Sequence, residues 1–131
     1  MTLLFPLREP ASPQERDQQI MELALRQARN AWQAEEVPVG AIIVRGNQIL
    51  GRGANGVEAL KDATAHAETE AIRDAAKRLG TRDLSDCQMV TNGGRPCPMC
   101  ETAAYWAQIK KMWLEDGEDV VNAGGPKYGG C

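Results

Sequence analysis

The order of helix-like and strand-like stretches along the chain is the feature that most constrains its fold. Two apolar stretches flank the turn signal Gly46-Asn47 and predict an antiparallel β-hairpin. The later strands are separated by helices, which favours parallel crossover connections. The predicted helices are about 13–37, 65–79 and 96–108, and the predicted strands are about 40–45, 48–54, 88–91 and 111–114, with one short helix at about 118–122. This order predicts an α/β fold, a three-layer α/β/α sandwich with a mixed sheet of four to five strands.

The first helix has a marked beginning and one apolar face. Ser12 can cap it, Pro13 suits the first helical position, and Glu15 completes a capping box. Apolar residues then follow at spacings of three and four, which predicts a buried stripe. The residues of this stripe are Ile20, Leu23, Ala24, Ala28, Ala31 and Trp32. The helix is expected to end before Pro38, because the residue preceding a proline avoids the α region.

The length of the chain, 131 residues, predicts one domain. We expect residues 1–131 to form it, with an irregular N-terminus at 1–11 and a Gly-rich tail at 124–131. No apolar run approaches the ~18–20 residues of a membrane span. The N-terminus has neither a basic leader nor a continuing apolar core, which favours a cytoplasmic protein over a secreted one.

The formal net charge of −3 argues against a broad nucleic-acid surface. A local basic stretch around the second predicted helix leaves two interpretations open. Arg73, Lys77, Arg78 and Arg82 either form a solvated helix face or track the phosphates of an RNA.

Two short motifs carry the chemistry, and each falls at the start of a predicted helix. The first is His66-Ala67-Glu68, which contains the one histidine of the chain, and the second is Pro96-Cys97-Pro98-Met99-Cys100. His66, Cys97 and Cys100 supply three of the four tetrahedral positions of Zn²⁺, which leaves one position open for water, as in catalytic sites. Cysteines three apart on a first helical turn point the same way, and a helix N-terminus favours their thiolate form. The fourth histidine or cysteine of a closed structural site is not found near these motifs, and Cys131 could serve only by folding back.

Glu68 lies two residues past the histidine, beside the predicted metal but outside its ligand set. Such a carboxylate can take a proton from an activated water and pass it to a ring nitrogen and then to departing ammonia. His-x-Glu followed by Pro-Cys-x-x-Cys is typical of zinc nucleobase deaminases. A thiol redox pair is the alternative for Cys97 and Cys100, but it explains neither His66 nor Glu68. Cys87 is expected to be a small buried side chain.

The motifs resemble those of the cytidine/deoxycytidylate deaminase superfamily, in the branch that holds guanine deaminases, fungal-type cytosine deaminases and tRNA adenosine deaminases. The resemblance covers about residues 37–125 and includes Val37-Pro-Val-Gly-Ala-Ile-Ile-Val, Gly51-Arg-Gly-Ala-Asn55 and Ala63-Thr-Ala-His-Ala-Glu68. It implies one Zn²⁺ per chain on His66, Cys97 and Cys100, with Glu68 as the catalytic residue. It also implies substrate contacts, at Asn55, Ala67, Pro96 and Trp106. Asn55 has an alternative role as a turn cap, and Trp106 has one as a core residue.

The resemblance implies a hydrolytic deaminase of an aminated nucleobase-like heterocycle. Ala104-Tyr105-Trp106-Ala107 is most similar to guanine deaminases, which favours guanine or a related purine or pterin. The alternatives are a tRNA adenosine-to-inosine deaminase and a cytosine or nucleoside deaminase. The sequence departs from the family pattern at Arg95, where a glutamate is usual, and the loop 92–94 is about one residue longer and richer in glycine.

The family usually continues through another strand and helix where this chain ends at Cys131. On that ground we expect a homodimer whose partner helps to close the site. Large apolar side chains suited to an interface are available at Tyr105, Trp106 and Trp113, and Trp32 is expected in the core or at an interface.

Overall fold

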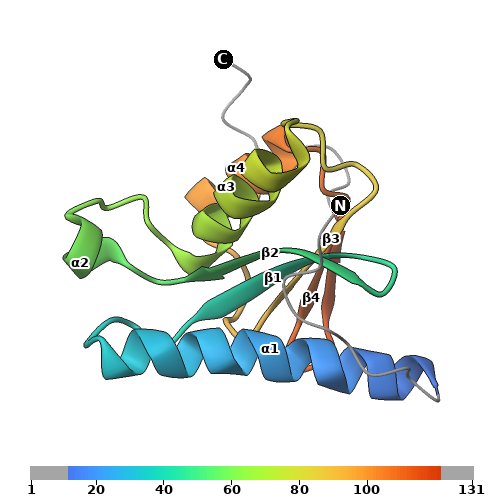
Figure 1. Cartoon of the computed structure of the whole chain (residues 1–131), viewed down its shortest axis with the longest axis horizontal. Helices are drawn as coiled ribbons and strands as arrows, with labels where there is room; N and C mark the ends of the chain where they lie inside the picture. The colour runs from blue at the N-terminus through green and yellow to red at the C-terminus, as the bar shows by residue number, and fades with distance from the viewer. Residues whose placement is uncertain (1–11, 122–131) are drawn as a thin grey trace.

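The computed structural model describes residues 12–121, and Figure 1 shows how its elements are arranged. The helices are α1 (Pro13–Gln33), α2 (Val57–Leu60), α3 (Ala67–Leu79) and α4 (Pro98–Trp106), and the strands are β1 (Gly40–Arg45), β2 (Gln48–Ala54), β3 (Gln88–Thr91), β4 (Lys111–Leu114) and β5 (Asp119–Val121). The predicted segments 1–11 and 124–131, with Cys131, lie outside the described residues.

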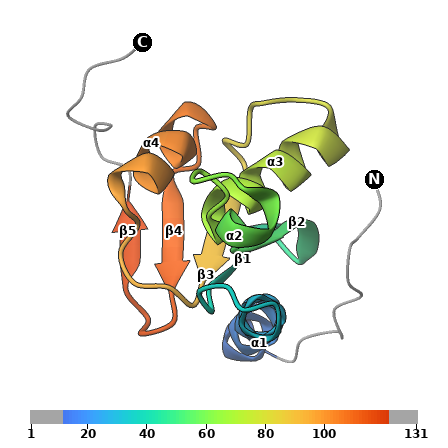
Figure 2. The ribbon, with the colours of Figure 1, turned by 90° about the vertical axis from the view of Figure 1, so that its left-hand side faces the viewer.

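The strands form one mixed sheet in the order β2-β1-β3-β4-β5. Strand β1 is antiparallel to β2 and to β3, β3 is parallel to β4, and β5 is antiparallel to β4. Helix α1 covers one face of this sheet, and α3 and α4 cover the other (Figures 1 and 2). The predicted three-layer α/β/α architecture is therefore confirmed, with five strands in the sheet.

The core lies in two layers because successive side chains of a strand point to opposite faces of the sheet. Ile42 and Val44 of β1 pack with Ile20 and Leu23 of α1 on one face. Ala41 and Ile43 face the other side, toward the alanine stripe of α3. The second layer includes Ala67, Ala71, Ala75, Met89, Ala104 and Met112, together with Cys87, whose predicted burial is confirmed.

Small residues allow both main helices to lie directly on the sheet. A Cβ atom at Gly53 would lie 2.2 Å from the carbonyl oxygen of Ala67, and one at Gly40 would lie 2.2 Å from that of Ala24. Both distances are far below van der Waals contact, so only glycine fits at either position. Gly53 therefore holds the first turn of α3 against β2, at the helix end where His66 is the N-cap residue.

The end of the described chain differs from its prediction. The short helix expected at about 118–122 is wrong, because β5 occupies Asp119–Val121 as the second strand of a tight hairpin. Gly117 has a φ of 86°, and the N–H of Leu114 donates to the oxygen of Glu118 at 2.9 Å. The β-branched residues Val120 and Val121 then favour a strand over a helix.

Trp32 is not part of the buried face of α1, because 68% of its surface is exposed. Ala31 takes the buried position at this end of the helix, and the next residue lies about 100° further round the helix axis. The connection between β2 and α3, for which no helix was predicted, contains the short helix α2. No helix within residues 12–121 is long and apolar enough to cross a membrane.

Candidate metal centre

The topology brings the two sequence motifs to one edge of the sheet. Strands β2 and β3 are both antiparallel to β1, so they run in the same direction and end at the same edge. Helix α3 follows β2 and helix α4 follows β3, and both helices begin at that edge (Figure 2). His66 is the N-cap residue of α3, and Cys97 is the N-cap residue of α4. The three predicted ligands therefore meet although 34 residues separate His66 from Cys100.

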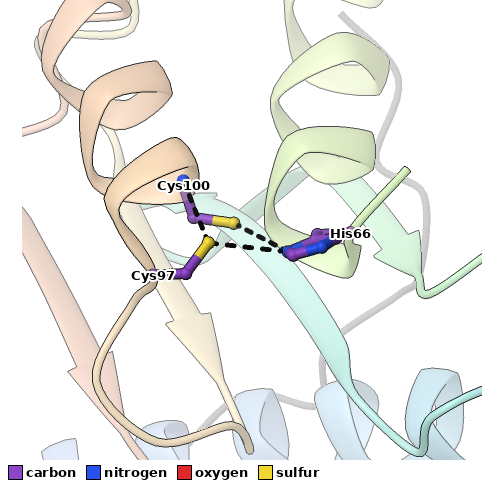
Figure 3. A group of neighbouring side chains, drawn as sticks. All are labelled: His66, Cys97 and Cys100. Atoms are coloured by element: carbon purple, nitrogen blue, oxygen red, sulfur yellow. Dashed lines mark hydrogen bonds between the residues drawn. The ribbon is translucent and has the colours of Figure 1, made fainter. Parts of the chain in front are cut away.

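The local structure of α4 points both sulfur atoms at the histidine ring (Figure 3). Pro98 occupies the first helical position, and the N–H of Cys100 donates to Sγ of Cys97 at 3.5 Å. Sγ of Cys97 lies 3.6 Å from Nδ1 of His66, and Sγ of Cys100 lies 3.5 Å from the same nitrogen. The donor atoms of the three residues all lie within 4.8 Å of one another.

These distances fit Zn²⁺. A tetrahedral ion with Zn–S bonds of about 2.3 Å and a Zn–N bond of about 2.0 Å places sulfur and nitrogen about 3.5 Å apart. The observed sulfur-to-nitrogen separations are 3.6 and 3.5 Å, in agreement with those of a tetrahedral zinc site. Among residues 12–121, the group that could hold a metal consists of these three residues, which leaves the fourth tetrahedral position open.

Glu68 lies beside this group, in the first turn of α3, and its surface is only 8% exposed. Burial raises the pKa of the Cys100 thiol, and the negative charge of Glu68 raises it further. A buried thiol next to a carboxylate needs a compensating cation to ionise. A cation bound by the three donors would supply that compensation, and the carboxylate of Glu68 stands next to the group of three donors without belonging to it.

The four residues predicted to contact the substrate lie at different distances from the metal group. Asn55 lies near the metal group, because the next residue, Gly56, donates its N–H to the oxygen of Ala65 at 2.9 Å, directly before His66. The side-chain oxygen of Asn55 accepts a hydrogen bond from the N–H of Val57 at 3.2 Å, which is the turn-capping role. Contact between Asn55 and a substrate stays a prediction, as does that of the half-buried Pro96 beside Cys97.

Ala67 and Trp106 have less direct positions. The side chain of Ala67 is fully buried in the core layer under α3. Trp106 is the last residue of α4, about 12 Å along the helix axis from its ligand-bearing start. Its side chain is 54% exposed, so the core interpretation of Trp106 is wrong, and within the described part of one chain it does not lie beside the metal ligands.

Two polar residues near the site were missing from the sequence interpretation. The carboxylate of Glu36 is buried and accepts hydrogen bonds from the N–H groups of Glu58 and Ala59. Asn92 accepts from the N–H of Gly40 at 2.8 Å and donates to the oxygen of Pro38 at 3.1 Å. In the sequence, the only signal for Glu36 is that it directly precedes the motif that begins at Val37. The only signal for Asn92 is that it lies in the loop that leads to Pro96.

The fold and the donor group together define a class of protein. It is a three-layer α/β/α domain that binds a metal through one histidine and two cysteines at the starts of two helices, with one ligand position open. The profile of the cytidine and deoxycytidylate deaminase zinc-binding region matches residues 14–115, and the chain belongs to this family. Its cofactor is Zn²⁺, in agreement with the donor group.

The chain is similar to relatives with two different substrates in their names. It is 41% identical over 110 residues to a tRNA-specific adenosine deaminase of Aquifex aeolicus, a match that covers 84% of this chain and 68% of the relative. It is 44% identical over 88 residues to a guanine deaminase of Bacillus subtilis, covering 66% of this chain and 56% of the relative. A solved structure from a study of A-to-I editing by tRNA:A34 deaminases superposes with a TM-score of 0.71 at 37% identity, over 74% of each chain.

Proposed function

We propose that this chain is a zinc-dependent hydrolytic deaminase that removes the amino group of a nucleobase-like heterocycle. The observation that carries the proposal is the His66–Cys97–Cys100 donor group with the carboxylate of Glu68 beside it. The three side chains would hold Zn²⁺ through Nδ1 and two sulfur atoms. When bound, the ion supplies Lewis-acid activation of water near neutral pH.

Glu68 is the proposed proton carrier of the reaction. Water adds its oxygen to the ring carbon, the carbon–nitrogen bond to the amino group breaks, and the products are a carbonyl compound and ammonia. The carboxylate takes a proton from the attacking water and delivers it to a ring nitrogen. It then takes the second proton, from the new hydroxyl group on the ring carbon, and delivers it to the departing amino group. Its buried position excludes bulk water from these transfers.

The proposed substrate contacts come from the loops that lead to the metal ligands. Asn55 is the proposed contact for a polar atom of the ring, and Ala67 and Pro96 flank the residues that hold the ion. The positive end of the α4 helix dipole also lies at the ligand-bearing start of this helix and suits an oxygen that gains negative charge. Trp106 would contribute from its own chain only after movement, or from a second copy.

The first candidate substrate is guanine or a related amino purine or pterin. The supporting observations are the likeness of Tyr105-Trp106 to guanine deaminases and the identity of 44% with the Bacillus subtilis guanine deaminase. Ammonia release should be measured with guanine, adenine, cytosine, pterins and their nucleosides, with the Glu68→Gln variant as the blank. Release above this blank from any of them supports the deaminase. If none of these compounds, nor adenosine within a tRNA anticodon stem-loop, releases ammonia, the proposal is wrong.

The second candidate substrate is adenosine in tRNA, and a basic surface along the edge strand β2 favours it. Side chains of α3 and β2 line a hollow of about 350 Å³ that includes Arg52, Arg73, Lys77 and Arg78, with Glu70 and Asp74. Arg52 also lines a neighbouring hollow of about 270 Å³ with Arg26 and Arg29 of α1. Six cations therefore gather along one edge of a chain whose net charge is −3. Arg82, which belonged to the predicted basic stretch, lines neither hollow.

If RNA lies along β2, loss of single charges there will weaken binding in a salt-dependent way. Lys77→Gln and Arg26→Gln should each reduce the affinity for an anticodon stem-loop and flatten the slope of log affinity against log salt by about one unit or less. Filter binding at several salt concentrations measures both quantities. Arg82→Gln removes the same charge outside the hollows and is the control. Equal affinities and slopes for all three variants would contradict the RNA candidate.

We also propose a homodimer whose interface includes Tyr105 and Trp106. These side chains are 42% and 54% exposed and line a groove of about 480 Å³ with Gln108, Ile109 and Lys110. Exposed aromatic residues of this kind are enriched at interfaces. Trp106→Glu should shift the mass measured by light scattering toward a monomer, whereas Trp32→Glu, at the exposed tryptophan of α1, should leave it unchanged. A wild-type monomer would contradict the dimer.

A further inference from the structure

Glu36 is a buried carboxylate that the proposed chemistry does not use. Its surface is 6% exposed, whereas the neighbouring Glu35 is exposed. One carboxylate oxygen accepts the N–H of Glu58 at 2.9 Å, and the other accepts the N–H of Ala59 at 2.8 Å. A buried negative charge is expensive unless it is hydrogen-bonded, so these two bonds are strong and specific.

The two N–H groups belong to the connection that carries Asn55 at one end and His66 at the other. This connection closes on itself, since Gly56 donates to Ala65 at 2.9 Å and Asp62 donates to Val57 at 3.1 Å. These two bonds tie its parts together, and the carboxylate of Glu36 fastens its helix α2 to the turn after α1. In Figure 1, α2 stands apart from the sheet at the same end of the molecule as this turn.

The backbone next to Glu36 is bonded to both loops that lead to metal ligands. The oxygen of Val39 accepts the N–H of Asn55 at 3.1 Å. On the other side, Asn92 binds Gly40 and Pro38, and it lies in the loop that leads from β3 to Cys97. Residues 36–40 are thus a brace between the Asn55 loop and the Cys97 loop.

We propose that Glu36 is a positioning residue that sets the place of Asn55 through α2. The side-chain oxygen of Asn55 is bonded to the N–H of Val57, one residue before the first N–H group that Glu36 accepts. A shift of α2 therefore moves the Asn55 side chain directly. The inference rests on the proposed function, because it assigns to Asn55 the binding of the substrate ring. Glu36 itself does not touch the reacting atoms, because the hydrogen bonds of its carboxylate go to the backbone of α2 and not to a metal donor or to Glu68.

Glu36→Gln tests the role with almost no change of shape. An amide has one oxygen and one NH₂ group, so one backbone N–H of α2 would face a donor in place of an acceptor. We expect KM to rise on the order of tenfold, with kcat changed much less and zinc content unchanged. The amides of Glu58 and Ala59 should exchange their hydrogens about ten times faster. Glu35→Gln makes the same change at the exposed neighbour and should leave all these quantities at the wild-type level.

A double mutant distinguishes a positioning role of Glu36 from a general loss of stability, because the effects of Glu36→Gln and Asn55→Ala on KM should not be independent. In an Asn55→Ala background, Glu36→Gln should raise KM little further, because the side chain it positions is already absent. Independent, multiplicative effects of the two changes would overturn the proposal, and so would a Glu36→Gln enzyme with wild-type KM. If Glu36→Gln does not fold, Glu36→Asp, which keeps the charge but reaches one N–H less well, gives the same comparison.

Failure of the proposed function would show itself differently. A wild-type chain that deaminates no substrate contradicts the deaminase assignment, whereas unchanged exchange of the Glu58 and Ala59 amides in Glu36→Gln contradicts the anchoring of α2. Exchange is measured on the full chain and needs no substrate, so the two failures are distinguishable.

Discussion

Replacing Glu68 by glutamine is expected to abolish ammonia release while the fold and the zinc content stay intact. The amide has nearly the same shape as the carboxylate, but it cannot accept and return a proton. Loss of a general acid–base group typically costs ~10²–10⁴-fold in rate, and here one group serves several transfers, so the upper end of that range is expected. Ammonia release under saturating substrate gives kcat, and metal analysis of the same sample gives the zinc content.

The control for this experiment is Glu70→Gln, two residues further along α3. Glu70 is also acidic and partly buried in the first turn, but its carboxylate pairs with Arg73 and points along the outside of the helix. Its replacement should leave kcat within about threefold of the wild type, since surface ion pairs contribute little. A Glu68→Gln variant that keeps near-wild-type turnover would remove Glu68 from the mechanism.

The parts of the fold that sequence predicted correctly are those with local signals. Ser12 and Pro13 mark the start of α1, and the side chain of Ser12 accepts the N–H of Glu15 as the capping box requires. The turn at Gly46 and the two apolar runs around it specify the β1–β2 hairpin. The metal group was predictable because a single histidine and a Cys-x-x-Cys pair at helix starts leave few other uses for three such donors.

The parts that sequence reasoning missed depend on tertiary contacts. Glu36 has no pattern that separates it from the exposed Glu35, and only the arrival of α2 from elsewhere in the chain makes its burial favourable. Trp32 and Trp106 are large apolar residues that propensity places in the core, yet each lies on the exposed side of its helix, next to a buried alanine, Ala31 or Ala107. Val120 and Val121 form a strand because β4 offers them an edge to pair with.

The same dependence on tertiary structure explains why the reaction class is easier to derive than the substrate. The donors and Glu68 lie within two short segments at the starts of α3 and α4, so their chemistry follows from motif and topology. The residues proposed to contact the base lie in the loops after β2 and β3 and in α3 and α4, and the basic hollows combine side chains of α1, β2 and α3. Such surfaces have no sequence period, and they become visible only when the elements are assembled.

Replacing Cys97 by alanine is expected to remove zinc and to destabilise the protein. Two donors remain, and the buried thiol of Cys100 then lacks the cation that favours its ionised form. We expect the zinc content to fall from about one to well below one per chain, with a loss of about 2–4 kcal/mol in stability under conditions that saturate the wild type. Atomic absorption gives the first quantity, and thermal unfolding with and without a chelator gives the second.

The matched control for the loss of zinc is Cys87→Ala. Cys87 is buried in the core layer and does not belong to the group of three donors, and burial together with the neighbouring Asp86 raises the pKa of its thiol to about 12. Its replacement should leave the zinc content unchanged, and the chelator should lower its unfolding temperature as much as that of the wild type. A wild-type protein that is purified without chelators, carries no zinc and unfolds at the same temperature with or without a chelator would contradict the assigned donor set. Cys97 and Cys100 would then be better explained as a thiol redox pair. That alternative gives no role to Glu68, which lies beside Cys100.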